Sequence, residues 1–187
     1  MPSIFYLTRN GLLEPLGQSQ VMSYLKGLSR DHQITLITFE KPKDMADAQA
    51  VAKAKADCEA HNIDWHPKNF RLSPKLLAPA WSMIEMFWSA LQAARRGDAQ
   101  LIHARSYLPA AVAWAMNRIT GTPFIFDMRA LWPEELITAG RLRRGSIIHK
   151  VLTHLEKVCL RDAAAVVSLT DAAVGYLQDK YPTELQG

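Results

Sequence analysis

The chain has 187 residues, which fits one domain, and its 49% hydrophobic and 21% charged residues are usual for a globular protein. Its two cysteines form no CxxC or CxxH pattern, which argues against a disulfide framework or a zinc site and favours a reducing cytoplasm. The net charge of +4 is too small to indicate nucleic-acid binding. The sequence shows no signal-peptide pattern and no apolar run of about 18 residues, so we expect a cytoplasmic protein without a membrane span.

Short apolar runs alternate with helical patterns along the whole chain. Strands are expected at Ser3–Thr8, Gln33–Glu40, Ile63–Phe70, Leu101–Ile102, Phe124–Phe126 and Ala164–Leu169. Helices are expected from Gly17, from an N-cap at Asp44 to about Ala60, over Ala80–Arg96, Pro109–Asn117 and Pro133–Ile137, after Ser146, and from Thr170-Asp171 to Lys180. This alternation predicts an α/β protein, a three-layer α/β/α Rossmann-like domain with a mainly parallel sheet. We expect residues 1–187 to form that single domain.

Some segments carry extra information. Pro67 weakens the third expected strand, because proline has no backbone N–H for the ladder. The helix after Ser146 is the clearest amphipathic helix. The expected core face of this helix holds Ile147, Ile148, Val151, Leu152, Leu155, Val158 and Cys159. The last strand, Ala164–Leu169, is expected to be buried. The helix over Ala80–Arg96 is unusually aromatic, with Trp81 and Trp88, and core or domain-interface packing explains this better than a membrane-surface face.

The central segment Leu101–Trp132 reads as a β-α-β unit with polar residues after both strands. His103, Arg105 and Ser106 follow the first strand, and Asp127 and Arg129 follow the second. Ligands of parallel sheets bind outside the carboxyl ends of the strands, so these side chains are expected to meet at one rim. The alternative is structural, because His103 can be a satisfied core residue and Asp127 can simply form an ion pair.

The segment Thr8–Ser19, between the first strand and the first helix, is a second candidate for ligand binding. Its glycines do not form GxGxxG, and the chain has no GxxxxGK[ST] motif. The backbone N–H groups of a helix starting at Gly17 would favour an anion, although Gly17 can also serve only to permit a tight helix start. Asn10 and Gln18 are further candidate substrate-binding residues.

Trp132 follows the second rim motif and is also a candidate substrate-binding residue. Its ring could stack on a sugar or fold back onto the core. No Ser-His-Asp set, metal-ligand spacing or carboxylate pair stands out in the sequence. The residues by themselves therefore predict a rim that tolerates anions and indicate no particular reaction.

Four strings together resemble the N-terminal domain of retaining glycosyltransferases of family 4, which have the GT-B fold. They are LLEPLGQSQVMSYLKGLS (Leu12–Ser29), LIHARSYLPAAVAW (Leu101–Trp114), FDMRALWPEE (Phe126–Glu135) and LEKVCLRDAAAVVSLTDAAVGYL (Leu155–Leu177). The strings occur in the family's order and cover nearly the whole chain. The resemblance implies that the chain is the acceptor-binding half of such an enzyme. The donor-binding domain, with its Glu-(seven residues)-Glu motif, is absent from this chain.

The resemblance also implies roles for individual residues. His103 and Asp127 occupy positions of cleft or catalytic residues, and Arg105 stands where a second histidine is common. Gly17 lies where the family's glycine-rich loop meets the first helix, with Gln18 in place of a second glycine. The implied reaction transfers a sugar from a donor such as a UDP- or GDP-sugar to an acceptor hydroxyl with retention, without a metal or other cofactor.

The resemblance also implies partners for this chain, and the residues leave two alternative functions open. The expected partners are the donor-binding domain, a sugar or lipid-linked acceptor, and a peripheral contact with the cytoplasmic membrane, but no nucleic acid. The fragment alone is expected to be inactive. One alternative is a stand-alone, non-enzymatic module that binds a sugar or phosphate. The other is a nucleotide-dependent oxidoreductase or epimerase, favoured by Glu40 at the end of the second strand and disfavoured by the missing GxGxxG.

Overall fold

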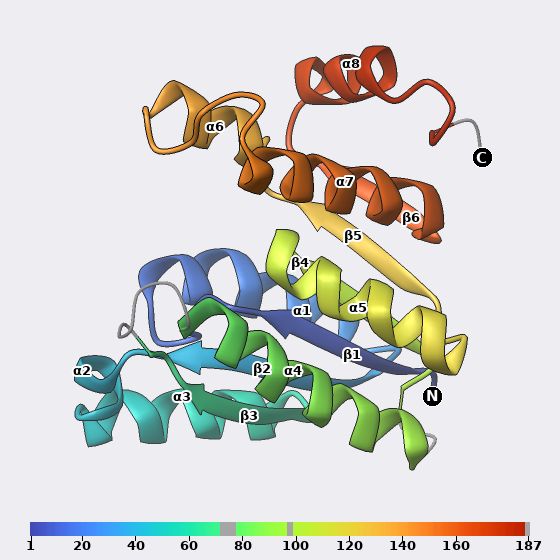
Figure 1. The fold of residues 1–187 in the computed structure, drawn as a ribbon. Helices are drawn as coiled ribbons and strands as arrows, with labels where there is room; N and C mark the ends of the chain where they lie inside the picture. Colours follow the sequence, from blue (N-terminus) through green and yellow to red (C-terminus); the bar gives the residue numbers. More distant parts are fainter. Residues whose placement is uncertain (72–77, 97–98, 186–187) are drawn as a thin grey trace.

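Six parallel strands form one sheet in the computed structural model, which describes residues 1–71, 78–96 and 99–185. The strands are β1 (Ser3–Thr8), β2 (Gln33–Glu40), β3 (Ile63–Asn69), β4 (Leu101–Arg105), β5 (Phe124–Met128) and β6 (Ala165–Ser168). Their order is β3-β2-β1-β4-β5-β6, and every neighbouring pair is parallel. The chain therefore winds outward in both directions from the β1/β4 pair, which confirms the predicted Rossmann-like α/β fold (Figure 1).

Helices cover both faces of the sheet. They are α1 (Ser23–Leu28), α2 (Pro42–Met45), α3 (Ala48–Ala60), α4 (Ala78–Arg95), α5 (Tyr107–Thr120), α6 (Trp132–Thr138), α7 (Ile147–Asp162) and α8 (Asp171–Lys180), with a π-helix, η1 (Gly17–Met22), directly before α1. On one face η1, α1 and α3 pack against Tyr6, Ile34 and Leu36. On the other face α4, α5 and α7 pack against the alternate strand residues, among them Phe5 and Phe126. This alternation gives the three-layer arrangement.

Two predicted elements differ in detail from the structure. The helix expected from an N-cap at Asp44 is divided into α2 and α3, and Asp44 lies inside α2. The N-cap of α3 is Asp47, whose carboxylate accepts hydrogen bonds from the backbone N–H groups of Gln49 and Ala50 at 3.1 and 3.0 Å. Strand β3 forms despite Pro67, because it lies at the edge of the sheet, where a missing N–H is tolerated.

The predicted strand at β6 forms, but its expected burial was wrong. Strand β6 lies at the other edge of the sheet, and Val167 and Leu169 are about half exposed. The expected core face of α7 is also only partly correct. Val158 and Cys159 are buried near its C-terminal end, whereas three apolar residues at its start, Ile147, Ile148 and Val151, are exposed.

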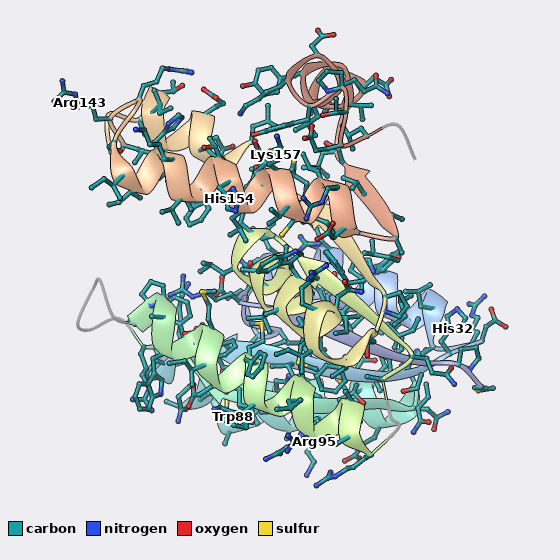
Figure 2. All side chains as sticks on the ribbon, turned by 45° about the vertical axis from the view of Figure 1, so that its right-hand side comes forward. His32, Trp88, Arg95, Arg143, His154 and Lys157 are labelled. Carbon is teal, nitrogen blue, oxygen red and sulfur yellow. The ribbon has the colours of Figure 1, made fainter. Side chains whose placement is uncertain are left out.

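Helix α4 carries its tryptophans on the outside. Met86 and Ala90 are buried against the sheet, while Trp81 and Trp88 are 48% and 54% exposed. Core packing was therefore wrong for both tryptophans, and domain-interface packing stays a prediction. Figure 2 shows Trp88 on the outer side of α4, with Arg95 further along the same helix. In the part of the chain that the structure describes, no helix combines the length and apolar character needed to cross a membrane. The exposed tryptophans therefore form a surface feature of a domain built around its own core.

Candidate functional site

The candidate site lies where the topology reverses, between β1 and β4. The strands all point toward the same edge of the sheet (Figure 1), and the register places Thr8 of β1 beside Arg105 of β4, and Arg105 beside Asp127 of β5. Strands β4 and β5 are longer than the sequence predicted, so His103, Arg105 and Asp127 are strand residues. Their side chains therefore share one face of the sheet, close to its carboxyl edge.

Asp127 lies in the wall of a small cavity of about 150 Å³, here called the Asp127 cavity. It is lined by Tyr6, Gln20, Tyr24, His103, Arg105, Asp127, Arg129 and Val167. The structure thus brings together four predicted residues, His103, Arg105, Asp127 and Arg129. These come from two neighbouring strands and the loop after β5, and the remaining walls come from β1, β6 and the η1–α1 helix.

The charged groups surround the Asp127 carboxylate without closing onto it. Its Oδ2 lies 3.6 Å from His103 Nε2 and 3.7 Å from an Arg105 nitrogen, and its Oδ1 lies 3.6 Å from an Arg129 nitrogen. These separations suit electrostatic attraction but exceed hydrogen-bond length. Among the described residues, Asp127 Oδ1, His103 Nε2 and Arg129 Nε are buried and have no hydrogen-bond partner. Buried polar atoms are normally paired, so these atoms are free to exchange hydrogen bonds with water or with a bound molecule.

Two residues that the sequence analysis did not select hold the cluster in place. Gln20 Oε1 accepts hydrogen bonds from Arg105 at 2.6 Å and from Arg129 at 3.0 Å, so it fixes both guanidinium groups. Gln20 lies on the π-helix η1, a geometry that often occurs at functional sites. Tyr6 stacks on His103 with ring centroids 4.6 Å apart. Burial raises the pKa of Tyr6 to about 12, so its hydroxyl stays neutral beside the charged groups at neutral pH.

Neither residue had a visible signal in the sequence. No sequence motif predicts the π-helix that turns Gln20 toward the arginines, and Tyr6 looks like any aromatic residue of a buried strand. A third residue, Tyr24, meets His103 edge-on with centroids 5.6 Å apart. Burial, and secondarily the charge of Asp127, raise the pKa of Tyr24. The imidazole of His103 is therefore held by two neutral phenol rings, which restricts its orientation.

Three other predicted residues, Asn10, Ser106 and Trp132, lie at a second cavity of about 300 Å³. This Arg9 cavity is lined by Arg9, Asn10, Glu14, Lys41, Phe70, Ser106, Leu108, Pro109 and Trp132. Ser106 joins β4 to α5 with φ of 79°, an unusual value for a residue with a side chain. The sequence analysis placed Ser106 at the rim with His103 and Asp127, and Asn10 in the Thr8–Ser19 segment, whereas the structure brings Asn10 and Ser106 to one cavity apart from His103 and Asp127.

Gly17 and Gln18 line neither cavity and have local roles. A Cβ on Gly17 would lie 2.1 Å from the Gly11 carbonyl oxygen, so Gly17 permits the helix to pack against the preceding loop. The helical turn already begins before Gly17, and the Gln18 N–H donates to the Glu14 carbonyl at 3.0 Å. The structure therefore supports tight packing over an open anion-binding helix start, and ligand contacts by these two residues stay a prediction.

Glu40 is fully buried and stabilises the same loop, between β1 and η1, through hydrogen bonds. Its carboxylate accepts hydrogen bonds from the backbone N–H groups of Leu12 and Leu13 at 2.6 and 3.2 Å, and from the Thr38 hydroxyl at 2.5 Å. These bonds occupy both carboxylate oxygens inside the protein, so Glu40 is not presented to a nucleotide ribose. The feature that favoured an oxidoreductase or epimerase is thus accounted for by loop structure.

Comparison with known families agrees with this architecture. The family model described as glycosyl transferase 4-like domain matches residues 17–184, which is most of the chain. A comparison with curated proteins found no match. The matched region contains the strand ends and the helices that build the Asp127 cavity, apart from Tyr6 on β1. The chain therefore belongs to the glycosyl transferase 4-like domain family.

Proposed function

We propose that this domain binds the acceptor of a glycosyltransferase that uses a nucleotide-sugar donor and retains the anomeric configuration. One observation carries the proposal. Asp127 Oδ1 and His103 Nε2 are buried, lack hydrogen-bond partners among the described residues, and line the same small cavity. A sugar hydroxyl can donate one hydrogen bond and accept another, so it suits a carboxylate oxygen beside an imidazole nitrogen.

In this proposal Asp127 acts by orienting the acceptor hydroxyl. Its Oδ1 accepts the hydroxyl hydrogen, which directs an oxygen lone pair toward the anomeric carbon of the donor. Arg105 and Arg129 balance the carboxylate charge, and Gln20 holds both arginines. The bond from the anomeric carbon to the nucleotide diphosphate breaks as the bond to the acceptor oxygen forms on the same side. The hydroxyl proton passes to Asp127 Oδ1 and the nucleotide diphosphate departs as the anion, so no protein nucleophile takes part.

The proposal divides the work between two domains. The donor is bound mainly by a second domain, and this domain supplies the acceptor wall of the cleft between them. The enzyme would be a hexosyltransferase of the cytoplasm, with α4 touching the membrane surface through Trp81 and Trp88. These 187 residues by themselves are expected to bind UDP- or GDP-sugars weakly and to transfer nothing.

A transfer assay tests the proposal in a protein that contains both domains. The enzyme is incubated with a panel of UDP- and GDP-hexoses and sugar acceptors, and the product is analysed by proton NMR. We expect a glycoside with the anomeric configuration of the donor. An inverted product would contradict the retaining mechanism, and tight binding of a nucleotide sugar by the 187-residue chain would contradict the division of labour.

A further inference from the structure

Arg9 places a positive charge in the wall of the Arg9 cavity. It directly follows β1, and its guanidinium lies over the Phe70 ring, 4.6 Å from the ring centroid. Arg9 Nε is buried and has no hydrogen-bond partner in the described part of the chain, where no carboxylate lies within ion-pair distance of this residue either. Burial lowers the pKa of Arg9 from its ordinary value, which reflects the loss of hydration around the charge.

The rest of the cavity adds positive character around Arg9. The register places Arg9 and Ser106 at adjacent strand ends, because the preceding residues, Thr8 and Arg105, are paired. Lys41 is paired with Glu14 at 3.0 Å, so these two charges cancel and the charge of Arg9 remains. Ser106 is the N-cap of the 14-residue helix α5 but makes no side-chain cap hydrogen bond. No side-chain cap therefore occupies the free backbone N–H groups of the first turn, which are those of Tyr107 and Leu108, because Pro109 has none.

The cavity is larger than a single oxyanion requires. Its volume is about 300 Å³, and four apolar side chains, Phe70, Leu108, Pro109 and Trp132, contribute to its walls. The Trp132 ring is held by Tyr107, with ring centroids 5.6 Å apart, so this wall is firmly placed. Apolar and aromatic walls beside a small number of polar groups are typical of sites for small organic ligands. The ligand that fits carries a negative charge on a ring with an apolar face.

We propose that the Arg9 cavity binds an anionic sugar, with its phosphate or carboxylate on Arg9 and the first turn of α5, and its ring against the apolar wall. This inference rests on the proposed function in that it takes the sugar to be the acceptor. A guanidinium recognises either oxyanion through paired N–H groups, so the shared chemistry is an oxyanion carried by a sugar ring.

The test is a ¹⁵N–¹H NMR titration of the 187-residue chain with glucose 6-phosphate, glucuronate and glucose. We expect one or both anionic sugars to shift the amide signals of Asn10, Ser106 and Leu108, while neutral glucose at the same concentration leaves them unchanged. A stronger response to glucose 6-phosphate identifies a phosphorylated acceptor, and a stronger response to glucuronate identifies a sugar acid. No shift with either anion, or shifts confined to residues of the Asp127 cavity such as Gln20 and Arg129 without any at Asn10 or Ser106, would overturn the proposal.

A matched pair of variants tests the role of Arg9. Arg9→Gln should weaken binding of the better anionic sugar by about tenfold, the usual effect of losing one charge-assisted contact. Arg143→Gln removes the same charge from an exposed arginine in the loop before α7 that does not line the Arg9 cavity, and it should leave binding unchanged (Figure 2). Equal weakening by both variants would indicate diffuse attraction and contradict a site at Arg9.

The result of the NMR titration can be distinguished from the result of the transfer assay that tests the proposed function. If Arg9→Gln fails to fold, the map of shifted amides in the unmodified chain decides the question by itself. The titration contains no nucleotide sugar, so it can fail while transfer to a neutral acceptor by a protein with both domains succeeds. Conversely, an anionic sugar bound at Asn10 and Ser106 without any transfer activity would support the site and contradict the enzyme.

Discussion

Two glycines in the first helical segment should respond oppositely to the same substitution. Gly17 packs against the loop before it, and a Cβ there would lie 2.1 Å from the Gly11 carbonyl oxygen and 2.7 Å from the Leu12 Cα. Ordinary contacts of a Cβ begin at 3.4 Å, so Gly17→Ala must widen this gap by about 1.3 Å, the difference between the two distances. Because both opposing atoms belong to the backbone, no side chain can move aside.

The magnitude follows from what the loop would lose. Overpacking costs about 1–3 kcal/mol, and displacing Leu12 also strains its hydrogen bond to the buried Glu40, which adds about 1.5–3 kcal/mol if the bond breaks. We therefore expect Gly17→Ala to lower the free energy of unfolding by about 3–5 kcal/mol. Gly27 is exposed in α1, and within the described residues no atom lies within 4 Å of an added Cβ. Gly27→Ala should therefore raise stability by about 0.4–1 kcal/mol.

Urea unfolding followed by circular dichroism measures both variants in the 187-residue chain. The reasoning predicts opposite signs, with the larger effect at Gly17. If Gly17→Ala were as stable as the unmodified protein, the close approach of η1 to the loop would be refuted. If Gly27→Ala were equally destabilising, the loss at Gly17 would reflect a general intolerance of the helix and not the contact with Gly11.

Three further predictions concern the loop, the site and the surface. Glu40→Ala should lower the free energy of unfolding by about 3–5 kcal/mol, because two buried donors and one partly buried donor lose their acceptor. Glu40→Gln keeps one oxygen and should cost less in the same urea assay, and equal losses would contradict this. Gln20→Ala should reduce kcat/KM of the two-domain enzyme about tenfold with little change in thermal stability, since it releases two guanidinium groups; unchanged kinetics would argue against its positioning role. Replacing Trp81 and Trp88 by serine should reduce co-sedimentation with phosphatidylglycerol vesicles at low salt. Replacing the exposed Ile147 and Val151 by serine is the control and should not reduce it. If the unmodified protein does not bind the vesicles, the membrane contact is refuted.

The fold was predictable because its signals are local. Apolar runs of strand length separated by amphipathic segments require a parallel sheet with helices on both faces, and each predicted strand is present. The errors have physical causes. The N-cap of α3 is Asp47 and not Asp44, because both acids precede a helical pattern and only the backbone decides which carboxylate reaches the free N–H groups. The burial of β6 could not be predicted, because apolar composition does not tell a central strand from an edge strand.

The candidate site was predictable only in part. His103, Arg105, Asp127 and Arg129 were identified because they follow the two short apolar runs of the predicted β-α-β unit, and the structure gathers them in one cavity. Gln20 could not be identified, because its contact with both arginines depends on the helical pitch of η1. The separation of Asn10, Ser106 and Trp132 into a second cavity also depends on three-dimensional packing, which strand order alone does not determine.

The central claim is that Asp127 orients the acceptor hydroxyl and takes up its proton. The kinetics of Asp127→Asn in the two-domain enzyme test this most directly, because asparagine keeps a side-chain oxygen but cannot take up a proton. Asp179→Asn, at an exposed position on α8, is the matched control. The account predicts that Asp127→Asn lowers kcat/KM at least about 100-fold without unfolding the protein, and that Asp179→Asn changes neither. Full activity of a folded Asp127→Asn enzyme would contradict the account.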